Sequence, residues 1–326
     1  MLEQGGLVAF PTETVYGLGA DAENPQAVAR IYTAKGRPSD HPLIVHLAPG
    51  ADVGYWAQDI PPAASLLMAA FWPGPLTLIL KRAAHIPSAV TGGQDSIGLR
   101  CPSHPVAIAL LRAFKDGRGG IAAPSANKFG HVSPTSAQHV RSEFGAEPLI
   151  ERILDGGQSE VGIESTILDL SRMDSVGPVL LRPGHISRTQ IAQVIGVLPK
   201  LADAAAPRAS GSLEAHYAPA TPVALVEADQ CAALCQRLLQ SGRRFTLIHY
   251  FTQPPAGAKA YFALPADPAG AAHDLYAALR SMDAVQAELI LVVSPPAGEA
   301  WQGIADRLRR AAFDSSGILQ RLEIAI

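Results

Sequence analysis

The chain has 326 residues, of which 48% are hydrophobic and 17% are charged, and its formal net charge is −3. This composition is typical of a globular protein long enough for two domains, and it excludes a disordered chain. Residues 1–200 hold 16 basic against 17 acidic residues, and residues 201–326 hold 10 against 12. Neither half has the positive charge of a nucleic-acid coat protein, so we expect no stable nucleic-acid binding.

The three cysteines, Cys101, Cys231 and Cys235, are too few for a disulfide framework, and no Cys-x-x-Cys pair is present. The first twenty residues lack a basic segment, and no apolar run has membrane-spanning length. We therefore expect a cytoplasmic protein with no membrane partner.

Apolar runs alternate with helical patterns in the first 196 residues. The first strand, 7–10, ends at Pro11, and Gly17 and Gly19 beyond it would let the backbone approach a ligand. The first helix, 25–35, has Asn24 as its cap before a proline. Further strands are predicted at 43–47, 76–80, 96–100, 121–123, 149–154, 165–170 and 179–182, and further helices at 61–71, 105–114, 136–144 and 186–195. This order predicts a mixed α/β sheet.

Small residues and prolines then interrupt the pattern and predict a linker at 198–221. Strands at 223–226, 245–249 and 289–293 follow, alternating with helices at 230–240, 270–282 and 299–313. This series predicts a small, Rossmann-like parallel sheet. The predicted domains are therefore residues 1–197 and residues 222–326.

Two cations one residue apart, Lys35 and Arg37, follow the first helix. Such a pair in a loop can hold an anionic group such as a triphosphate. The same pair can equally be a solvated basic turn.

Hydroxyl, amide and guanidinium groups occur where other strands end, and this edge of an open α/β sheet is a usual binding site. Ser125 and Asn127 could instead be turn or cap residues, and Ser165 could be a hydroxyl at a strand edge. Arg182 could lie on the surface. Arg100 ends an apolar strand, so a charged partner is expected for it. The chain has no phosphate-binding loop motif, complete dinucleotide fingerprint, zinc-protease motif or hydrolase elbow.

Taken together, these segments resemble the YrdC-type L-threonylcarbamoyladenylate synthases in their long, two-domain form. The resemblance rests on seven motifs in a fixed order: Pro11–Leu18, Lys35–Pro38, His41–His46, Trp72–Thr77, Ala123–Asn127, Glu164–Ile167 and Leu181–Gly184. It spans about residues 5–196. Three later stretches are similar to the linker and C-terminal domain of that form: His216–Pro219, Asp274–Arg280 and Asp306–Arg310.

The resemblance implies a YrdC-like twisted mixed sheet and a nucleotidyltransferase that makes threonylcarbamoyl-AMP from L-threonine, bicarbonate and ATP, with Mg²⁺ on the phosphates. A separate tRNA threonylcarbamoyl transferase complex would receive the product for tRNA modification. It also implies residue roles. Threonine would be held by Thr14, His46, Arg100, Ser125 and Ser165. ATP would be held by Lys35, Arg37, His41, Ser96, Asn127, Ser133, Arg182, His216 and Tyr217, with Lys35 and Arg37 acting in catalysis. His216 and Tyr217 would close the linker over the site.

This chain departs from the family pattern at three places. His41 stands where Asn is common, residues 210–215 differ from the usual linker, and only six residues precede Leu7 where relatives usually have a helix. We therefore expect either a natural start upstream or the loss of this helix. Two other functions are alternatives to this one. A carbamoyl-transfer module of hydrogenase maturation would need zinc-finger segments, and a double-stranded RNA-binding module would need a basic face.

Overall fold

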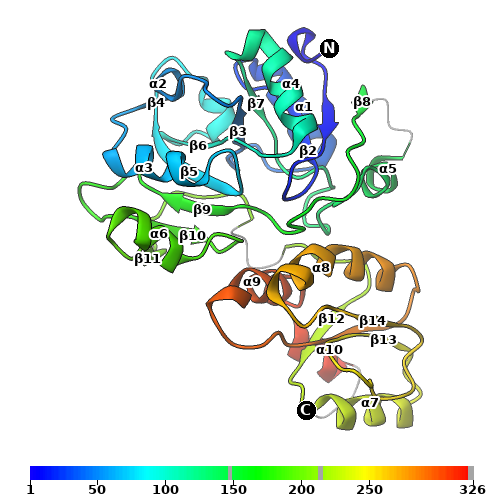
Figure 1. Cartoon of the computed structure of the whole chain (residues 1–326). Coiled ribbons are helices and arrows are strands. Elements are labelled where there is room, and N and C mark those ends of the chain that lie inside the picture. Colours follow the sequence, from blue (N-terminus) through cyan, green and yellow to red (C-terminus); the bar gives the residue numbers. More distant parts are fainter. Residues whose placement is uncertain (146–148, 212–215, 322–326) are drawn as a thin grey trace. The chain divides into compact units, whose positions relative to one another are not determined.

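The computed structural model describes residues 1–145, 149–211 and 216–321, which form two compact units (Figure 1). The first unit contains residues 1–129 and 133–211 of this described part. The second contains residues 130–132 and 216–321. Each unit has its own sheet and its own apolar core.

The first unit is built on a mixed sheet that joins eleven strands. In spatial order they are β11 (Lys200–Leu201), β10 (Val179–Arg182), β9 (Thr166–Asp169), β5 (Leu76–Arg82), β6 (Ser96–Arg100), β3 (Ile44–Leu47), β7 (Gly120–Ala122), β2 (Gly17–Asp21), β1 (Val8–Phe10) and β8 (Arg152–Ile153), with β4 (Ala57–Gln58) paired to β5. Strand β3 runs parallel to β6, whereas β6 runs antiparallel to β5. The predicted mixed α/β fold is thus confirmed.

Helices and short 3-10 turns connect these strands. They are η1 (Leu2–Gln4), α1 (Pro25–Lys35), α2 (Val53–Trp56), α3 (Pro62–Phe71), η2 (Ser88–Thr91), α4 (Pro105–Ala113), η3 (Phe114–Gly117), α5 (Ala137–Phe144) and α6 (Arg188–Ile195). Helix α1 begins as predicted, because the Asn24 side chain accepts hydrogen bonds from two backbone N–H groups of the first turn. It ends at Gly36, whose φ of 63° is left-handed. This ending places Lys35 on the helix and Arg37 just beyond it.

The two faces of the central strands differ in chemistry. Side chains alternate along a strand, so every second residue shares a face. Val45, Leu78 and Leu99 join the main apolar core with α1 and α3, whereas Ile44, Ile79 and Ile167 form a small separate cluster with Ala209. The face that carries this small cluster also carries His46 and Arg100, two residues further along their strands.

The second unit has a four-stranded, all-parallel sheet in the order β12 (Val223–Val226), β15 (Leu289–Val293), β13 (Phe245–His249) and β14 (Tyr261–Ala263). Its helical elements are α7 (Cys231–Gln240), α8 (Pro268–Asp283), η4 (Glu299–Trp301), α9 (Gln302–Ala311) and α10 (Ser315–Arg321). Strands β12, β13 and β15 have the predicted bounds. Strand β14 and helix α10 were not predicted, because each is short and carries no clear apolar period.

Two local features differ from the predicted pattern. Gly17 and Gly19 lie inside strand β2. A Cβ at Gly19 would lie 2.8 Å from both Ile121 and Phe10, so close packing in the sheet excludes a side chain there. The strand predicted at 149–154 is reduced to the two residues of β8.

Candidate functional site

The candidate site lies on the sheet face of the first unit that carries His46 and Arg100. These two residues are register partners on the parallel strands β3 and β6, so their side chains stand next to each other. Gly98 precedes Arg100 on the same face, and a Cβ there would lie 3.1 Å from Ile79. The face therefore combines an imidazole and a guanidinium with the apolar side chains of Ile44 and Ile79.

Arg100 is buried and has a carboxylate partner, as its position at the end of an apolar strand predicts. Its Nη2 lies 2.7 Å from Oε1 of Glu13, and both side chains are at most 5% exposed. Its Nη1 donates to Oγ1 of Thr14 at 2.8 Å, and Nε donates to the Gly74 carbonyl at 3.4 Å. The Ser103 N–H also donates to Glu13, at 3.1 Å. The guanidinium is thus held in one orientation beside the Thr14 hydroxyl.

Sequence analysis missed Glu13 as a functional residue. The signal was present, because Arg100 needed a partner and Glu13 lies in the motif that also supplies Thr14. A single sequence does not say which of many carboxylates provides that partner.

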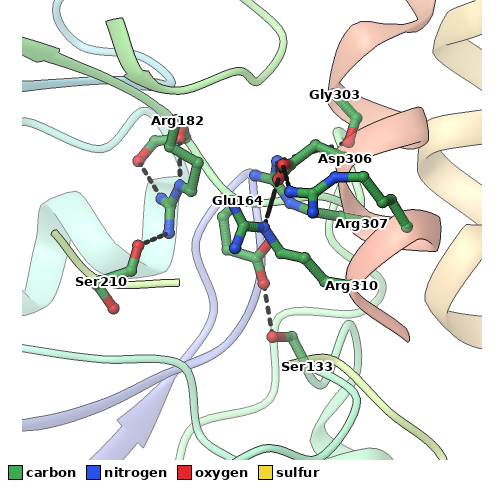
Figure 2. Close-up of polar contacts among 10 residues, drawn as sticks. Ser133, Glu164, Arg182, Ser210, Gly303, Asp306, Arg307 and Arg310 are labelled. Carbon is green, nitrogen blue, oxygen red and sulfur yellow. Dashed lines mark hydrogen bonds and ion pairs between the residues drawn. The ribbon is translucent and has the colours of Figure 1, made fainter. Parts of the chain in front are cut away.

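Ser165 and Arg182 lie together, although one was assigned to threonine and the other to ATP. Arg182 donates through Nη2 to Oγ of Ser165 at 3.1 Å and through Nε to the Ser165 carbonyl at 3.0 Å. Its Nη1 donates to the Ser210 carbonyl at 2.8 Å (Figure 2). Thr77 and Ser165 share a hydrogen bond of 2.8 Å between their hydroxyl oxygens. Arg182 is therefore buried, and the surface alternative is wrong.

His46 is buried beside Arg100 and the ring of Phe10. Burial, reinforced by the nearby Arg100 charge, lowers the pKa of His46 to about 3. The ring is therefore neutral at physiological pH, with Nδ1 lying 3.3 Å from the Ile44 carbonyl. A neutral imidazole can act as a hydrogen-bonding group in this site without adding charge.

This low pKa predicts a specific dependence of stability on pH. In the unfolded chain His46 binds a proton below about pH 6.5, whereas in the folded chain it stays neutral, so the unfolded state binds more protons and stability falls as pH falls. From pH 6.5 to 4.5 we expect His46 to account for a loss of about 2–3 kcal/mol. Urea unfolding of the parent and of His46→Gln at both pH values measures this difference. Equal acid sensitivity in the two proteins would contradict a neutral buried ring.

Lys35 and Arg37 lie at the end of α1 and are both buried, so the solvated-turn alternative is wrong. Lys35 donates through Nζ to the carbonyls of Ser125, at 2.6 Å, and Asn127. Burial and the charge of Arg37 hold the pKa of Lys35 well below its usual range. Arg37 donates to the Pro42 carbonyl at 3.0 Å, and its guanidinium carbon lies 5.9 Å from the ring centre of Phe129.

The remaining ATP candidates are distributed around these cations. His41 packs edge-on against Phe129, with ring centres 5.4 Å apart, and burial and Arg37 lower the pKa of His41. The Asn127 side chain donates to the Lys128 carbonyl at 2.7 Å. Ser133 donates to Oε1 of Glu164 at 2.6 Å (Figure 2). The fold thus brings His41 and Asn127 to the end of α1.

Ser96 begins β6 and lies near residues 208–210 of the linker. A small depression there is lined by Ser96, Gln94, Ile44, Ile79 and residues 208–210. Gln94 accepts a hydrogen bond from the Arg208 N–H at 2.8 Å, and Arg208 donates to the Gly92 carbonyl at 3.0 Å. Residues 208–210 therefore belong to the first unit and cover part of the candidate face. Residues 212–215, the rest of the divergent linker stretch, lie outside the described residues.

His216 and Tyr217 are also buried, but they group with the second unit. Across the described ranges, no three or more His, Cys, Asp or Glu side chains are placed to hold a metal ion. The same ranges contain no helix with the length and hydropathy needed to cross a bilayer.

Comparison with known proteins gives matches over nearly the whole chain. The family model Sua5_yciO_yrdC, described as "Telomere recombination", matches residues 1–184, and "Threonylcarbamoyl-AMP synthase, C-terminal domain" matches residues 186–313. The chain is 39% identical to the threonylcarbamoyl-AMP synthase of Pyrococcus abyssi, over 95% of this chain and 92% of that protein. It is 41% identical to that of Bacillus subtilis, over 96% and 91%. The crystal structure of P. abyssi Sua5 with L-threonine superposes with a TM-score of 0.88 at 37% identity, covering 96% of this chain and 92% of that one.

Proposed function

The chain belongs to the Sua5/YciO/YrdC family in its two-domain form, and on this premise we propose that it synthesises L-threonylcarbamoyl-AMP from L-threonine, bicarbonate and ATP, with release of pyrophosphate. The observation that carries the proposal is the buried Arg100 beside the Thr14 hydroxyl and the neutral His46, in a unit that also buries the cations Lys35 and Arg37 at the end of α1. An arginine with nearby hydroxyls suits an amino acid that has a carboxylate and its own OH. The cations Lys35 and Arg37 suit phosphates.

The proposed chemistry needs no covalent enzyme intermediate. The threonine amine and bicarbonate combine with loss of water to give a carbamate. A carbamate oxygen then forms a bond to the α-phosphorus of ATP while the bond to pyrophosphate breaks. Lys35 and Arg37 would orient the phosphates and stabilise the charge that develops on them. ATP would enter as its magnesium complex, in which the cation neutralises charge on the phosphates.

The product is a mixed anhydride that water can hydrolyse, so the site needs a cover. We infer that the 198–221 linker supplies it. Ala209 already packs on Ile44, Ile79 and Ile167, and Arg182 holds the Ser210 carbonyl at 2.8 Å. His216 and Tyr217 would complete the cover when nucleotide is bound. A separate transferase would then take the threonylcarbamoyl group to tRNA.

The proposal predicts that pyrophosphate release from ATP requires threonine and bicarbonate together. The hydroxyls of Thr14, Ser125 and Ser165 should also form hydrogen bonds with the hydroxyl of the substrate threonine. A site built to hydrogen-bond a substrate OH rejects the analogue without it, so 2-aminobutyrate should have a kcat/KM at least about a hundredfold lower. Pyrophosphate release and mass spectrometry of the adenylate measure both effects.

Omission of each substrate in turn is the control. Pyrophosphate release that does not depend on threonine or bicarbonate would refute the proposed reaction. Similar kcat/KM values for threonine and 2-aminobutyrate would not contradict the proposed reaction. They would show that the enzyme does not recognise the threonine hydroxyl.

A further inference from the structure

A short segment between two ATP candidates groups with the second unit. Asn127 and Ser133 belong to the first unit, whereas residues 130–132 between them pack with residues 216–321. This arrangement ties the loop that carries both ATP candidates to the second unit through the chain itself. The contacts that hold residues 130–132 are therefore relevant to the nucleotide site.

Two elements of the second unit hold this segment. The Ala218 N–H donates to the Gly130 carbonyl at 2.9 Å, and Ala218 and His131 form a parallel β-bridge. Arg280, in the last turn of α8, donates through Nη2 to the Val132 carbonyl. Val132 directly precedes Ser133, so a fixed Val132 carbonyl limits where the Ser133 hydroxyl can lie.

The linker residues next to Ala218 contact helices α8 and α9. The ring of Tyr217 lies 5.8 Å from that of Tyr276 on α8, and the Arg307 guanidinium carbon on α9 lies 5.5 Å from the Tyr217 ring centre. The His216 N–H donates to the Arg310 carbonyl at 3.4 Å. Tyr217 has a φ of 60°, a left-handed conformation that a bulky residue keeps only when its surroundings hold it.

Arg307 and Arg310 of α9 both pair with Asp306 (Figure 2). Arg307 is fully buried and lies 3.2 Å from Oδ2 of Asp306, and Nε of Arg310 lies 3.0 Å from the same oxygen. Burial alone would raise the pKa of Asp306, but Arg307 and Arg310 overcome this and lower it. The buried Arg307 is therefore paired, and it can face an aromatic ring without an uncompensated charge.

We propose that α8 and α9 form a platform that holds residues 130–132 of the nucleotide loop 127–133 and the linker residues 216–218 in register, and that Arg280 is the positioning residue for residues 130–132. This inference rests on the proposed ATP role of Asn127 and Ser133. It assigns a task to the two C-terminal sequence motifs: Asp274–Arg280 supplies Tyr276 and Arg280, and Asp306–Arg310 supplies the Arg307 side chain and the Arg310 carbonyl. The second unit thereby restrains the chain segment that directly precedes Ser133, without needing a catalytic group of its own.

The test compares Arg280→Met, which keeps the stem but removes the donors, with Arg280→Lys, which keeps a charged donor. The full chain is used throughout. We expect the Ala218 amide to exchange hydrogen about tenfold faster in Arg280→Met, because a charge-assisted hydrogen bond that restrains its partner segment is lost. We also expect about tenfold weaker binding of a non-hydrolysable ATP analogue by calorimetry. Arg280→Lys should recover part of both effects, and threonine affinity should stay within about twofold of the parent.

The matched control is Arg244→Met, which removes one positive charge from the same unit at a residue that pairs only loosely with Glu288, at 3.7 Å. It should behave as the parent in every measurement. Unchanged exchange at Ala218 in Arg280→Met overturns the platform, whatever the protein catalyses. Faster exchange with unchanged analogue affinity overturns the positioning role of Arg280. A parent protein that does not bind the analogue refutes the proposed function instead, and the exchange measurement still decides whether Arg280 holds the loop.

Discussion

Arg100→Met is expected to lower kcat/KM for threonine by at least about a hundredfold and to lower the free energy of unfolding by about 3–5 kcal/mol. The first effect follows from the loss of the group that would bind the substrate carboxylate. The second follows from Glu13, whose side chain is 3% exposed and would remain buried without its partner at 2.7 Å. Threonine-dependent pyrophosphate release and urea unfolding measure the two effects.

The two effects can be separated with a second substitution. In Glu13→Gln/Arg100→Met both charges of the pair are gone, and the glutamine can still accept the hydrogen bond from the Ser103 N–H. Stability should recover by about 2 kcal/mol or more, because no unpaired charge is left buried, whereas activity should not recover. Recovery of activity together with stability would show that Arg100 serves the fold alone. Activity near the parent value in Arg100→Met itself would refute its substrate role directly.

The sequence predicted those parts of the fold that depend on local pattern. Helix α1 illustrates this, because Asn24, Pro25 and Gly36 each act through the backbone next to them. The bounds of β6, β10, β12, β13 and β15 were also predicted, since each is an apolar run closed by turn residues or charges. The order of strands in the larger sheet was not predicted, because strand pairing depends on contacts between distant residues.

The candidate site was predicted as a set of residues but not as a geometry. Sequence predicted Lys35 and Arg37 as an anion-binding pair, whereas the structure buries both against main-chain carbonyls at the end of α1. Lys35 donates to the carbonyls of Ser125 and Asn127, and Arg37 donates to that of Pro42. A local sequence pattern does not predict such hydrogen bonds. The Glu13–Arg100 pair was missed for the same reason, since 87 residues separate its members along the chain. The sequence identifies each side chain directly, whereas the partner of that side chain depends on how distant parts of the chain fold together.

The partner of Arg37 changes how its role should be tested. If Arg37 lay in a solvated basic turn, truncation to alanine would leave the fold intact. The structure instead buries the guanidinium, which donates to the Pro42 carbonyl at 3.0 Å and faces the ring of Phe129. Arg37→Ala would therefore remove packing as well as charge. Arg37→Met, which keeps most of the stem, is the better variant.

Arg37→Met is expected to lower kcat/KM for ATP by about 10²–10³-fold, because a preorganised charged donor aimed at a phosphate acts mainly in the transition state. Arg37→Lys should recover only part of this activity, since a lysine ammonium cannot donate to the Pro42 carbonyl and to a phosphate oxygen with the same fork. The control is Arg118→Met in the same unit, which removes an equal charge from a side chain that is 84% exposed. Steady-state kinetics with ATP varied, alongside thermal unfolding of each variant, separates catalysis from folding. If Arg37→Met keeps the parent kcat/KM while its melting temperature falls, Arg37 supports the loop only, and the phosphate role passes to Lys35, Arg182 or another cation of this face.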